Sequence, residues 1–386
     1  MTKKLMVGIL VILIILSFFI GCKKTEKAKE TIKVGAILAV TGGASFLGAP
    51  ESKTLEMLVE ETNAAGGIDG HPVELIIKDS QASAEKAISF AKQLIEEEQV
   101  LAIIGPSTSG ESMAIKDICQ EAQMILLSCA AAEAIVDPVA SYVFKTPQKD
   151  SYAAIWIFKT MQQMGISKIG VVAGNTGFGN AGKGQLEKYA PEHGIEIAIA
   201  EVYDRGATDL TGVLTKLKAQ GVEAVVNWSI VPAQSIIPKN MAQLGMEVPL
   251  FQSHGFGNIK YAEAAGEAGE GIIFPCGRLL VADVLPADHP QKDLLVGYKD
   301  EYESRYGEDA STFGGHGYDA FILLKAAIEK AGSAEKTAVR DAIEGLQGVV
   351  GTAGIFNLSA SDHNGLGLDS FEMLTVKGGK FVPLKQ

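Results

Sequence analysis

The chain has 386 residues, which predicts two lobes rather than one ordinary domain of about 100–200 residues. Its composition, 47% hydrophobic and 21% charged, is that of a globular protein and excludes a wholly disordered chain. The formal net charge is −12, and an acidic surface repels phosphates, so we expect no nucleic acid as a partner.

The N-terminus has the pattern of a bacterial export signal. A short basic segment precedes an apolar run over residues 5–20, which is shorter than a typical membrane span of about 20 residues. Gly21 and Cys22 follow it and resemble a lipobox, in which the cysteine is acylated and becomes the mature N-terminus. We therefore predict a signal peptide over 1–21, lipidation at Cys22 and a polar tether over 22–30. The alternative is an uncleaved anchor helix; both interpretations place the remainder outside the cytoplasm, in the periplasm or at the cell surface.

Three further cysteines, Cys119, Cys129 and Cys276, leave at least one thiol free even in an oxidising compartment. Cys119 and Cys129 could pair with each other. Alternatively, all three are small buried hydrophobic residues. Neither the cysteines nor the six histidines have the spacing of a metal site, so we predict no metal.

From residue 31 onward, strand-like apolar runs alternate with segments of helical periodicity. In the first part, strands are expected at 31–39, 73–78, 101–104 and 124–127, and helices at 51–65, 83–98 and 109–122. After Pro147, helices are expected at 152–164, 181–190, 210–220 and 232–244, and strands at 168–173, 195–203, 224–227 and 249–252. This alternation predicts parallel sheets with helices on both faces, in two runs that divide near residue 148.

The turns that follow the strands are the candidate binding sites, because ligands of open parallel sheets bind beyond the carboxyl ends of the strands. The turn over 105–110 places three hydroxyls, the last on Ser109, at the start of a helix. Free backbone N–H groups and the helix dipole make it a candidate carboxylate or phosphate site, whereas capping alone needs one hydroxyl. At the next strand end, small residues over 128–132 either expose backbone amides to a ligand or form a tightly packed turn.

Other motifs carry less information. Residues 177–182 match GxGxxG, but an exported lipoprotein has no obvious supply of NAD and the first strand lacks the motif, so we expect no cofactor. His254 follows a strand, and His316 precedes a helix expected to begin at Tyr318; each faces a cleft or is a surface or capping histidine. No nucleophile motif stands out, and we predict that the protein is not an enzyme.

Three segments, in order and with similar spacing, carry a resemblance to a known family. Residues 63–70 (NAAGGIDG), Gly105-Pro106 with Ser109, and residues 317–320 (GYDA) are similar to motifs of the leucine/isoleucine/valine-binding proteins. These are type 1 solute-binding proteins of ATP-driven importers. The resemblance covers residues 31–382 and implies an α/β fold: two doubly wound parallel-sheet lobes, joined by a three-segment hinge, that close on a ligand.

The resemblance also implies a discontinuous domain organisation, with crossings near Pro147, Gly277 and 351–354. The lobes would be 31–147 with 278–353, and 148–277 with 354–386. The implied protein is a monomeric lipoprotein that delivers a small carboxylate to an ABC permease and its cytoplasmic ATPase, and touches the membrane only through its lipid anchor. A ligand sensor of the same fold is the alternative.

Carried over residue by residue, the resemblance implies that the Ser109 hydroxyl and the backbone amides of Ala130, Ala131 and Ala132 bind the ligand carboxylate. The contacts to an α-ammonium group match less well. A threonine is expected where Ala132 stands, and no acidic residue follows the strand at 249–252. Because an ammonium buried without an acceptor is costly, His254 is expected to donate to a neutral or anionic group instead.

The aromatic positions also differ from the family pattern. Family tyrosines are replaced by Phe46 and Phe178, and Trp228 stands at another strand end; these rings line the cleft or belong to the core. Asp150 either replaces the missing acidic partner or caps the helix at 152–164. Two ligand classes remain: a branched-chain or related hydrophobic amino acid, or an aromatic or branched aliphatic acid without an α-amino group.

Overall fold

The computed structural model describes residues 29–385. The predicted signal peptide, Cys22 and nearly all of the tether lie outside these residues. Among the described residues, no helix is both long and apolar enough to cross a membrane.

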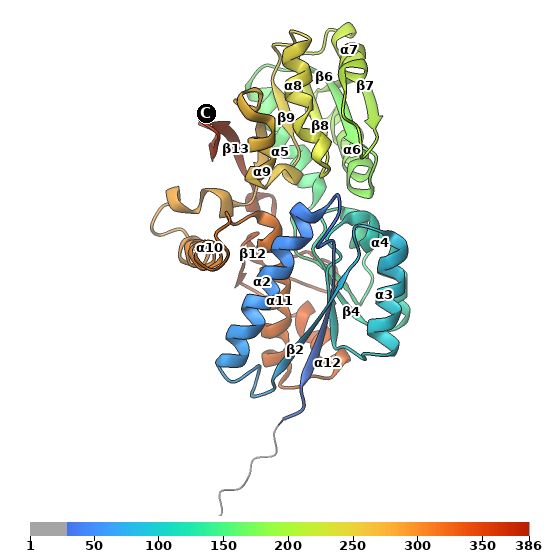
Figure 1. Cartoon of the computed structure of the whole chain (residues 1–386), viewed down its shortest axis with the longest axis vertical. Helices are drawn as coiled ribbons and strands as arrows, with labels where there is room; N and C mark the ends of the chain where they lie inside the picture. The colour runs from blue at the N-terminus through green and yellow to red at the C-terminus, as the bar shows by residue number, and fades with distance from the viewer. Residues whose placement is uncertain (1–28, 386) are drawn as a thin grey trace, which may run out of the picture. The chain divides into compact units, whose positions relative to one another are not determined.

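The first sheet has five parallel strands in the order β2-β1-β3-β4-β5. They are β1 (Ile32–Leu38), β2 (Val73–Asp79), β3 (Ala102–Ile104), β4 (Ile125–Ser128) and β5 (Val143–Lys145). Helices α3 (Ala84–Glu96) and α4 (Ser109–Glu121) bury their apolar residues on one face of this sheet. On the other face lie α2 (Ser45–Ala64), α11 (Thr312–Ala331) and α12 (Lys336–Glu344). Figure 1 shows α2 and α11 side by side.

The second sheet has seven strands in the order β14-β13-β10-β9-β8-β6-β7. The parallel part comprises β6 (Lys168–Gly174), β7 (Glu196–Tyr203), β8 (Ala224–Trp228), β9 (Leu250–Gln252) and β10 (Ile273–Cys276). Its helices are α5 (Asp150–Gln163), α6 (Gly177–Tyr189), α7 (Thr211–Ala219), α8 (Ile237–Gln243) and α9 (Ile259–Ala265). The predicted parallel α/β architecture is confirmed; an unpredicted antiparallel edge is added by β13 (Glu372–Lys377) and β14 (Lys380–Pro383).

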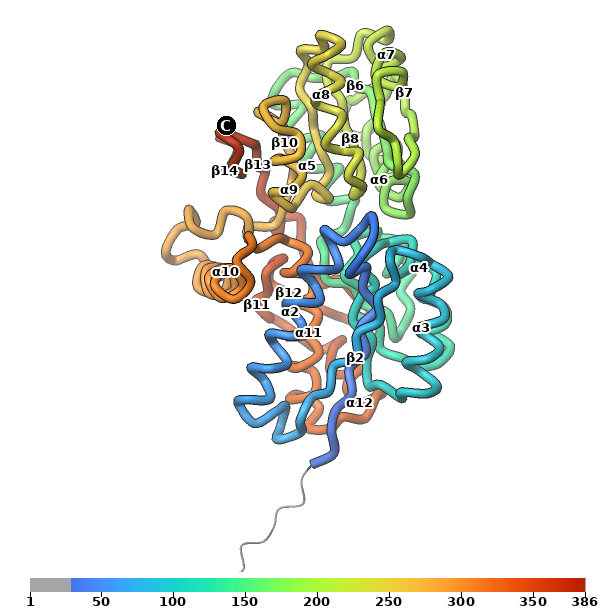
Figure 2. Tube along the Cα trace, viewed as in Figure 1, coloured from blue at the N-terminus to red at the C-terminus, as the bar shows by residue number. Residues whose placement is uncertain are grey.

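Late segments of the chain return to the first sheet. The tube in Figure 2 shows α10 (Lys292–Tyr306) and α11, in orange, near the blue α2. Tyr298 of α10 hydrogen-bonds Thr54 of α2 at 2.8 Å. The short strands β11 (Val349–Val350) and β12 (Ile355–Phe356) follow, and Phe356, Leu358 and Leu366 join the core of the first sheet. This packing differs from the predicted boundary at residue 354, because these apolar side chains are buried with the first sheet up to Leu366.

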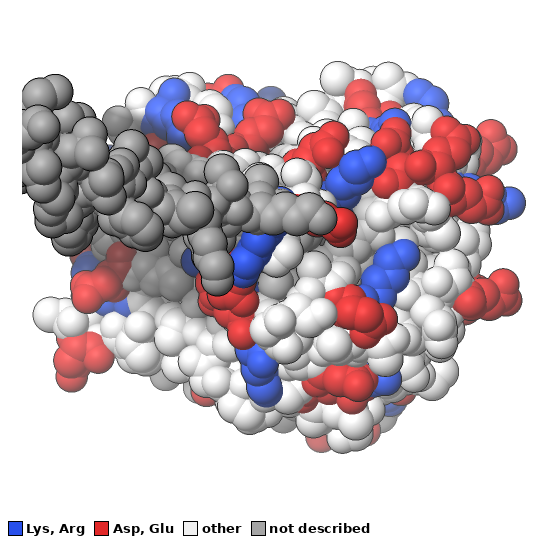
Figure 3. Space-filling view, turned by 90° about the horizontal axis from the view of Figure 1, so that it is seen from below, with Lys and Arg blue, Asp and Glu red and all other residues white. Residues whose placement is uncertain are grey.

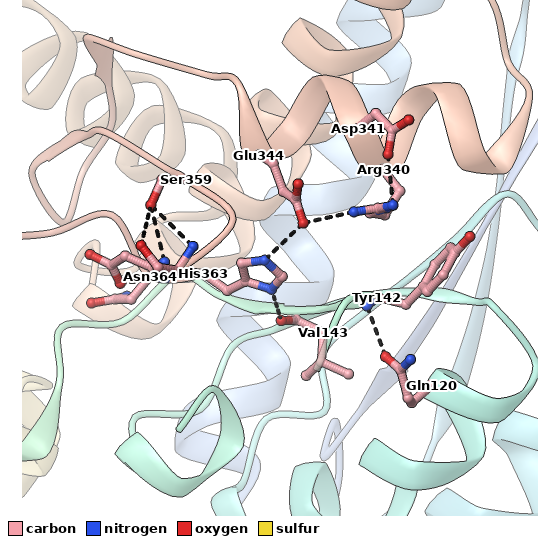
Figure 4. Close-up of polar contacts among 11 residues, drawn as sticks. Gln120, Tyr142, Val143, Arg340, Asp341, Glu344, Ser359, His363 and Asn364 are labelled. Atoms are coloured by element: carbon pink, nitrogen blue, oxygen red, sulfur yellow. Dashed lines mark hydrogen bonds and ion pairs between the residues drawn. The ribbon is translucent and has the colours of Figure 1, made fainter. Parts of the chain in front are cut away.

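The segment over 359–364 is fastened to the edge of the first sheet (Figure 4). His363 lies between the Val143 carbonyl oxygen, 2.9 Å from Nδ1, and the Glu344 carboxylate, 3.2 Å from Nε2. Glu344 also accepts from Arg340 at 2.7 Å. Asn364 donates to the Pro147 carbonyl at 2.8 Å. These bonds hold the point at which the chain leaves β5 for the second sheet.

The surface carries charges of both signs. Acidic and basic side chains are interspersed on the face that Figure 3 shows, and pairs such as Lys53–Glu308 (2.8 Å) occur on the surface.

All three described cysteines are free and buried, so the interpretation as buried hydrophobic residues is confirmed and pairing of Cys119 with Cys129 is wrong. Burial raises the pKa of Cys119 and of Cys276 to about 12, so both thiols are protonated near neutral pH.

Candidate functional site

Ser109 joins two neighbouring strand ends of the first sheet. It is the first residue of α4, whose cap is Thr108: the Thr108 hydroxyl accepts from the Glu111 amide at 3.4 Å. The Ser109 hydroxyl oxygen accepts from the Ala132 amide at 3.2 Å, so the turns after β3 and β4 are linked. A serine hydroxyl still has its own proton to donate when its oxygen accepts. Ser109 can therefore serve a ligand without losing this structural bond.

Two of the three predicted backbone donors in the next turn already have protein acceptors. The Ala130 amide donates to the Ser128 hydroxyl at 3.1 Å, and the Ala132 amide donates to Ser109. Within this turn, the amide of Ala131 is left without an acceptor among the described residues. A carboxylate at this position would meet the Ala131 N–H and the Ser109 hydroxyl.

An inner cavity lies between the ends of the two sheets. Its volume is about 20 Å³, roughly the space of one water molecule. A ligand of amino-acid size therefore requires the surrounding elements to move apart. The lining residues come from both sheets: Leu47, Ser107, Ser109, Cys129, Ala130, Ala131, Pro147, Phe178, Ile230, His254, Gly255, Phe313 and His316. The set combines the hydroxyls of Ser107 and Ser109 with apolar side chains and two histidines.

Four predicted site residues do not line this cavity. Ala132 supports Ser109, as described above. Phe46 packs against Tyr261, with ring centroids 5.2 Å apart. Trp228 is buried behind Phe178, at 5.8 Å between ring centroids. Asp150 is buried at the start of α5 and accepts from the Glu133 amide at 3.0 Å, a bond that fixes the segment after β4.

Asp150 also belongs to a buried pair of opposite charges beside the crossing segment. Burial raises the pKa of Asp150 to about 6, against the attraction of Lys145. Burial lowers the pKa of Lys145 to about 7, against the attraction of Asp150. The Lys145 ammonium donates to the Pro147 carbonyl at 2.6 Å and to the Gln148 carbonyl at 3.1 Å. These two bonds hold the Lys145 side chain against the segment in which the chain first passes from the first sheet to the second.

His254 and His316 are the unusual polar groups of the inner cavity. Both ring nitrogens of His254 and Nδ1 of His316 are buried without a hydrogen-bond partner among the described residues. The ring of His254 has Phe178 at 5.2 Å and Phe371 at 5.5 Å, both in edge-on geometry. Burial, with a further contribution from nearby Lys145, lowers the pKa of both histidines, that of His316 to about 3. Both imidazoles are therefore neutral at physiological pH.

The predicted helix start at Tyr318 is wrong, and His316 does not precede the helix but belongs to it. Helix α11 begins at Thr312, capped by the Ser311 hydroxyl, which accepts from the Gly314 amide at 3.5 Å. His316 therefore lies in the second turn of α11. Glycines in the first turn hide the helical pattern, because glycine has low helix propensity. Ser311 was the sequence signal that could have located the start.

A larger groove of about 1050 Å³ opens next to the inner cavity. It is lined by the residues just before α2, by the first turns of α3, α4 and α6, and by residues 205–208, 230–233 and 236. Phe178 and Ile230 line both spaces. At its base the first turns of α4 and α6 touch: a Cβ on Gly177 would lie 2.7 Å from the Gly110 nitrogen. Glycine at position 177 lets elements of the two sheets approach this closely, whereas a Cβ on Gly110 would lie 3.7 Å from the Gly177 nitrogen, an ordinary contact.

The GxGxxG segment has a packing role. A Cβ on Gly179 would lie 1.9 Å from the Gly174 carbonyl oxygen, and one on Gly182 would lie 2.0 Å from the Trp228 ring. Two of the motif's glycines therefore let α6 lie close to its own sheet, and Gly177 lets it meet α4.

The buried histidines predict a dependence of stability on pH. His316 has a pKa of about 3 in the native state and about 6.5 when unfolded, so the unfolded state binds more protons between these values. Stability is therefore lost as the pH falls below 6.5, by about 2 kcal/mol for this group between pH 7 and pH 5. Burial and, to a smaller extent, the charge of Lys145 cause this low pKa of His316. Urea unfolding should show a smaller loss over this range in His316→Leu; an unchanged loss would contradict the assignment.

Comparisons with known proteins agree with this architecture. A family model described as "Periplasmic binding protein" matches residues 31–380. A leucine-, isoleucine-, valine-, threonine- and alanine-binding protein of Pseudomonas aeruginosa is 24% identical over 325 residues, which is 84% of each chain.

Several solved structures also have a fold similar to that of this chain. An extracellular ligand-binding receptor from Rhodopseudomonas palustris has a TM-score of 0.86 and 28% identity, and the match covers 92% of this chain and 100% of that one. A branched-chain amino acid transporter substrate-binding protein from Streptococcus pneumoniae, solved with isoleucine, has a TM-score of 0.79 and 24% identity over 91% and 97% of the two chains. With two α/β sheets and a match over nearly the whole body, the chain belongs to the Leu/Ile/Val-binding family of type 1 periplasmic binding proteins, which are extracytoplasmic solute-binding proteins and not enzymes.

Proposed function

We propose that this protein is the solute-binding component of an ABC importer and takes a small hydrophobic carboxylate into the inner cavity. The two sheets with their helices act as lobes, 31–147 with 278–353 and 148–277 with 354–386, except that the packing of 355–366 favours the first lobe. A ligand that touches both lobes favours the closed form and is then delivered to a permease and its cytoplasmic ATPase. The protein acts as a monomer.

The main support for this proposal is the place that the inner cavity offers to the ligand carboxylate. Ser109 and Ala131 line the inner cavity, where the hydroxyl proton and an amide N–H without an acceptor are available. Ser109 is the first residue of α4, where the helix dipole favours an anion, and Ala131 adjoins Ala132, whose amide bonds Ser109. Leu47, Ile230 and Phe313 supply apolar surface for the rest of the ligand.

Two ligand classes fit this arrangement. The relatives, which include proteins named for binding leucine, isoleucine and valine, favour branched-chain or related amino acids. The lining itself favours a second class, aromatic or branched aliphatic acids without an α-amino group. No Asp or Glu is among the described residues that line the inner cavity, so an ammonium there would have no anionic partner.

Replacing Ser109 with alanine tests the carboxylate position. Loss of a hydrogen bond to a charged group should weaken binding by about 1.5–3 kcal/mol. Calorimetry with leucine, isoleucine, 4-methylpentanoate and 3-phenylpropanoate measures this loss and ranks the two ligand classes. Ser361→Ala, on an exposed turn, serves as the control and should bind like the unmodified protein. Affinity that is unchanged in Ser109→Ala would remove Ser109 from the site, and a ranking with leucine above the two acids would favour amino acids.

The lipid anchor at Cys22 is a separate proposal, supported by the sequence around it. Acylation would hold the protein on a bacterial membrane by this residue alone. In a fractionation assay, Cys22→Ser should move the protein from the membrane to the soluble fraction. Retention of this variant on the membrane would point to an uncleaved helix over residues 5–20.

A further inference from the structure

Two histidines from different sheets meet at the inner cavity. His254 follows β9 of the second sheet, whereas His316 lies in α11, which packs on the first. Each has only about 7% of its surface exposed, and each lines the cavity. Three of their four ring nitrogens have no hydrogen-bond partner among the described residues. Buried polar groups are nearly always paired in native proteins, so these nitrogens mark a place where a polar group of the ligand fits.

The chemistry of neutral imidazole selects that group. A neutral ring has one N–H donor and one nitrogen acceptor, so two rings together offer both kinds of bond. A hydroxyl both donates and accepts, and it can use one nitrogen of each histidine. An ammonium can only donate, so it would leave the N–H groups of the rings without an acceptor, and no Asp or Glu is among the described residues that line the cavity. A second carboxylate would place a charge beside the aromatic rings of Phe178 and Phe371, at a high desolvation cost.

We propose that His254 and His316 together bind a hydroxyl group of the ligand. This inference rests on the proposed function and narrows its ligand class to hydroxylated aromatic or aliphatic acids. It also makes His316 a specificity-determining residue, supplied by the other lobe from His254. The hydroxyl then bonds both lobes at once, and its binding contributes to closure.

Matched ligand pairs test this assignment. Calorimetry at pH 7.5 compares 3-phenylpropanoate with 3-(4-hydroxyphenyl)propanoate, and 4-methylpentanoate with 4-hydroxy-4-methylpentanoate. In the unmodified protein, the hydroxylated member of at least one pair should bind tenfold or more tightly than its partner. In His254→Leu and in His316→Leu this gain, taken as the ratio of the two affinities within each variant, should fall below threefold. Glutamine variants, which keep a donor and an acceptor, should recover part of the gain.

A matched control is His193→Leu, because His193 bonds the Tyr189 carbonyl at 3.0 Å at the far end of α6 from the cavity. It should keep the full preference for the hydroxylated acid.

The outcomes separate the inference from the proposed function. If the acids bind and Ser109→Ala weakens them, but the hydroxyl gives no gain or the gain survives in both leucine variants, only the inference is overturned. The unpartnered nitrogens would then bind water alone. If none of the acids and neither amino acid binds, the proposed function falls and the inference falls with it.

Discussion

Replacing Gly182 with alanine is expected to destabilise the protein by about 1–3 kcal/mol, the usual cost of overpacking a core. The new Cβ would lie 2.0 Å from the indole ring of Trp228, which is fully buried between α6 and His254. Neither the ring nor the helix can yield without disturbing the neighbours of the inner cavity. Urea or thermal unfolding of the purified protein measures the loss.

The same helix supplies the control. Gly184 lies two residues further along α6 and is exposed, and a methyl group added there would have no other atom within 4 Å. Gly184→Ala should therefore stabilise the protein by about 0.5–1 kcal/mol, because alanine loses less backbone entropy in a helix. Opposite signs for the two substitutions are the expected result. A Gly182→Ala protein as stable as the unmodified one would show that α6 does not pack on Trp228 in this way.

Removal of the Asp319 carboxylate is expected to cost about 3 kcal/mol or more, because it leaves several buried donors unpaired. This fully buried group accepts from the Thr352 amide at 2.5 Å, the Thr352 hydroxyl at 3.0 Å and the Ala353 amide at 2.8 Å. Asp319→Ala leaves three buried donors without an acceptor, each of which carries a desolvation penalty of about 1–3 kcal/mol, partly relieved by relaxation. The segment held in this way lies in the third predicted crossing.

Burial raises the pKa of Asp319 to about 7, so unfolding is best measured at pH 8, where the carboxylate is ionised. Asp117→Ala, on the exposed face of α4, is the control and should change stability by less than about 0.5 kcal/mol. If Asp319→Ala unfolded at the same urea concentration as this control, the three hydrogen bonds would contribute no net stability.

Much of the fold could be predicted because it follows from local patterns. Apolar runs bounded by turns located the parallel strands, and Thr108 and Ser109 marked the start of α4. The antiparallel β13 and β14 were missed because they follow the last regular strand–helix alternation. The packing of 355–366 on the first sheet was also missed, since it depends on contacts such as His363 with Glu344, between residues in separate segments.

The sequence predicted several residues of the candidate site but not the hydrogen bonds among them. The sequence pointed to Ser109, Phe178 and His254, and these residues line one cavity. It did not show that the Ala130 and Ala132 amides are already used inside the protein, because hydrogen bonds between turns depend on the tertiary arrangement. His316 was not assigned to the cavity, since its partner His254 lies far away in the sequence.

The contact between Gly110 and Gly177 has an electrostatic consequence. It brings together the first turns of α4 and α6, and each helix N-terminus carries a partial charge of about +0.5. Two like charges at contact oppose closure, and an anion beside both reverses the sign of that interaction. Ser109 and Phe178, one from each of these turns, line the inner cavity. If a carboxylate binds there as proposed, its negative charge offsets this repulsion, and we expect an uncharged amide of the same shape to bind more weakly.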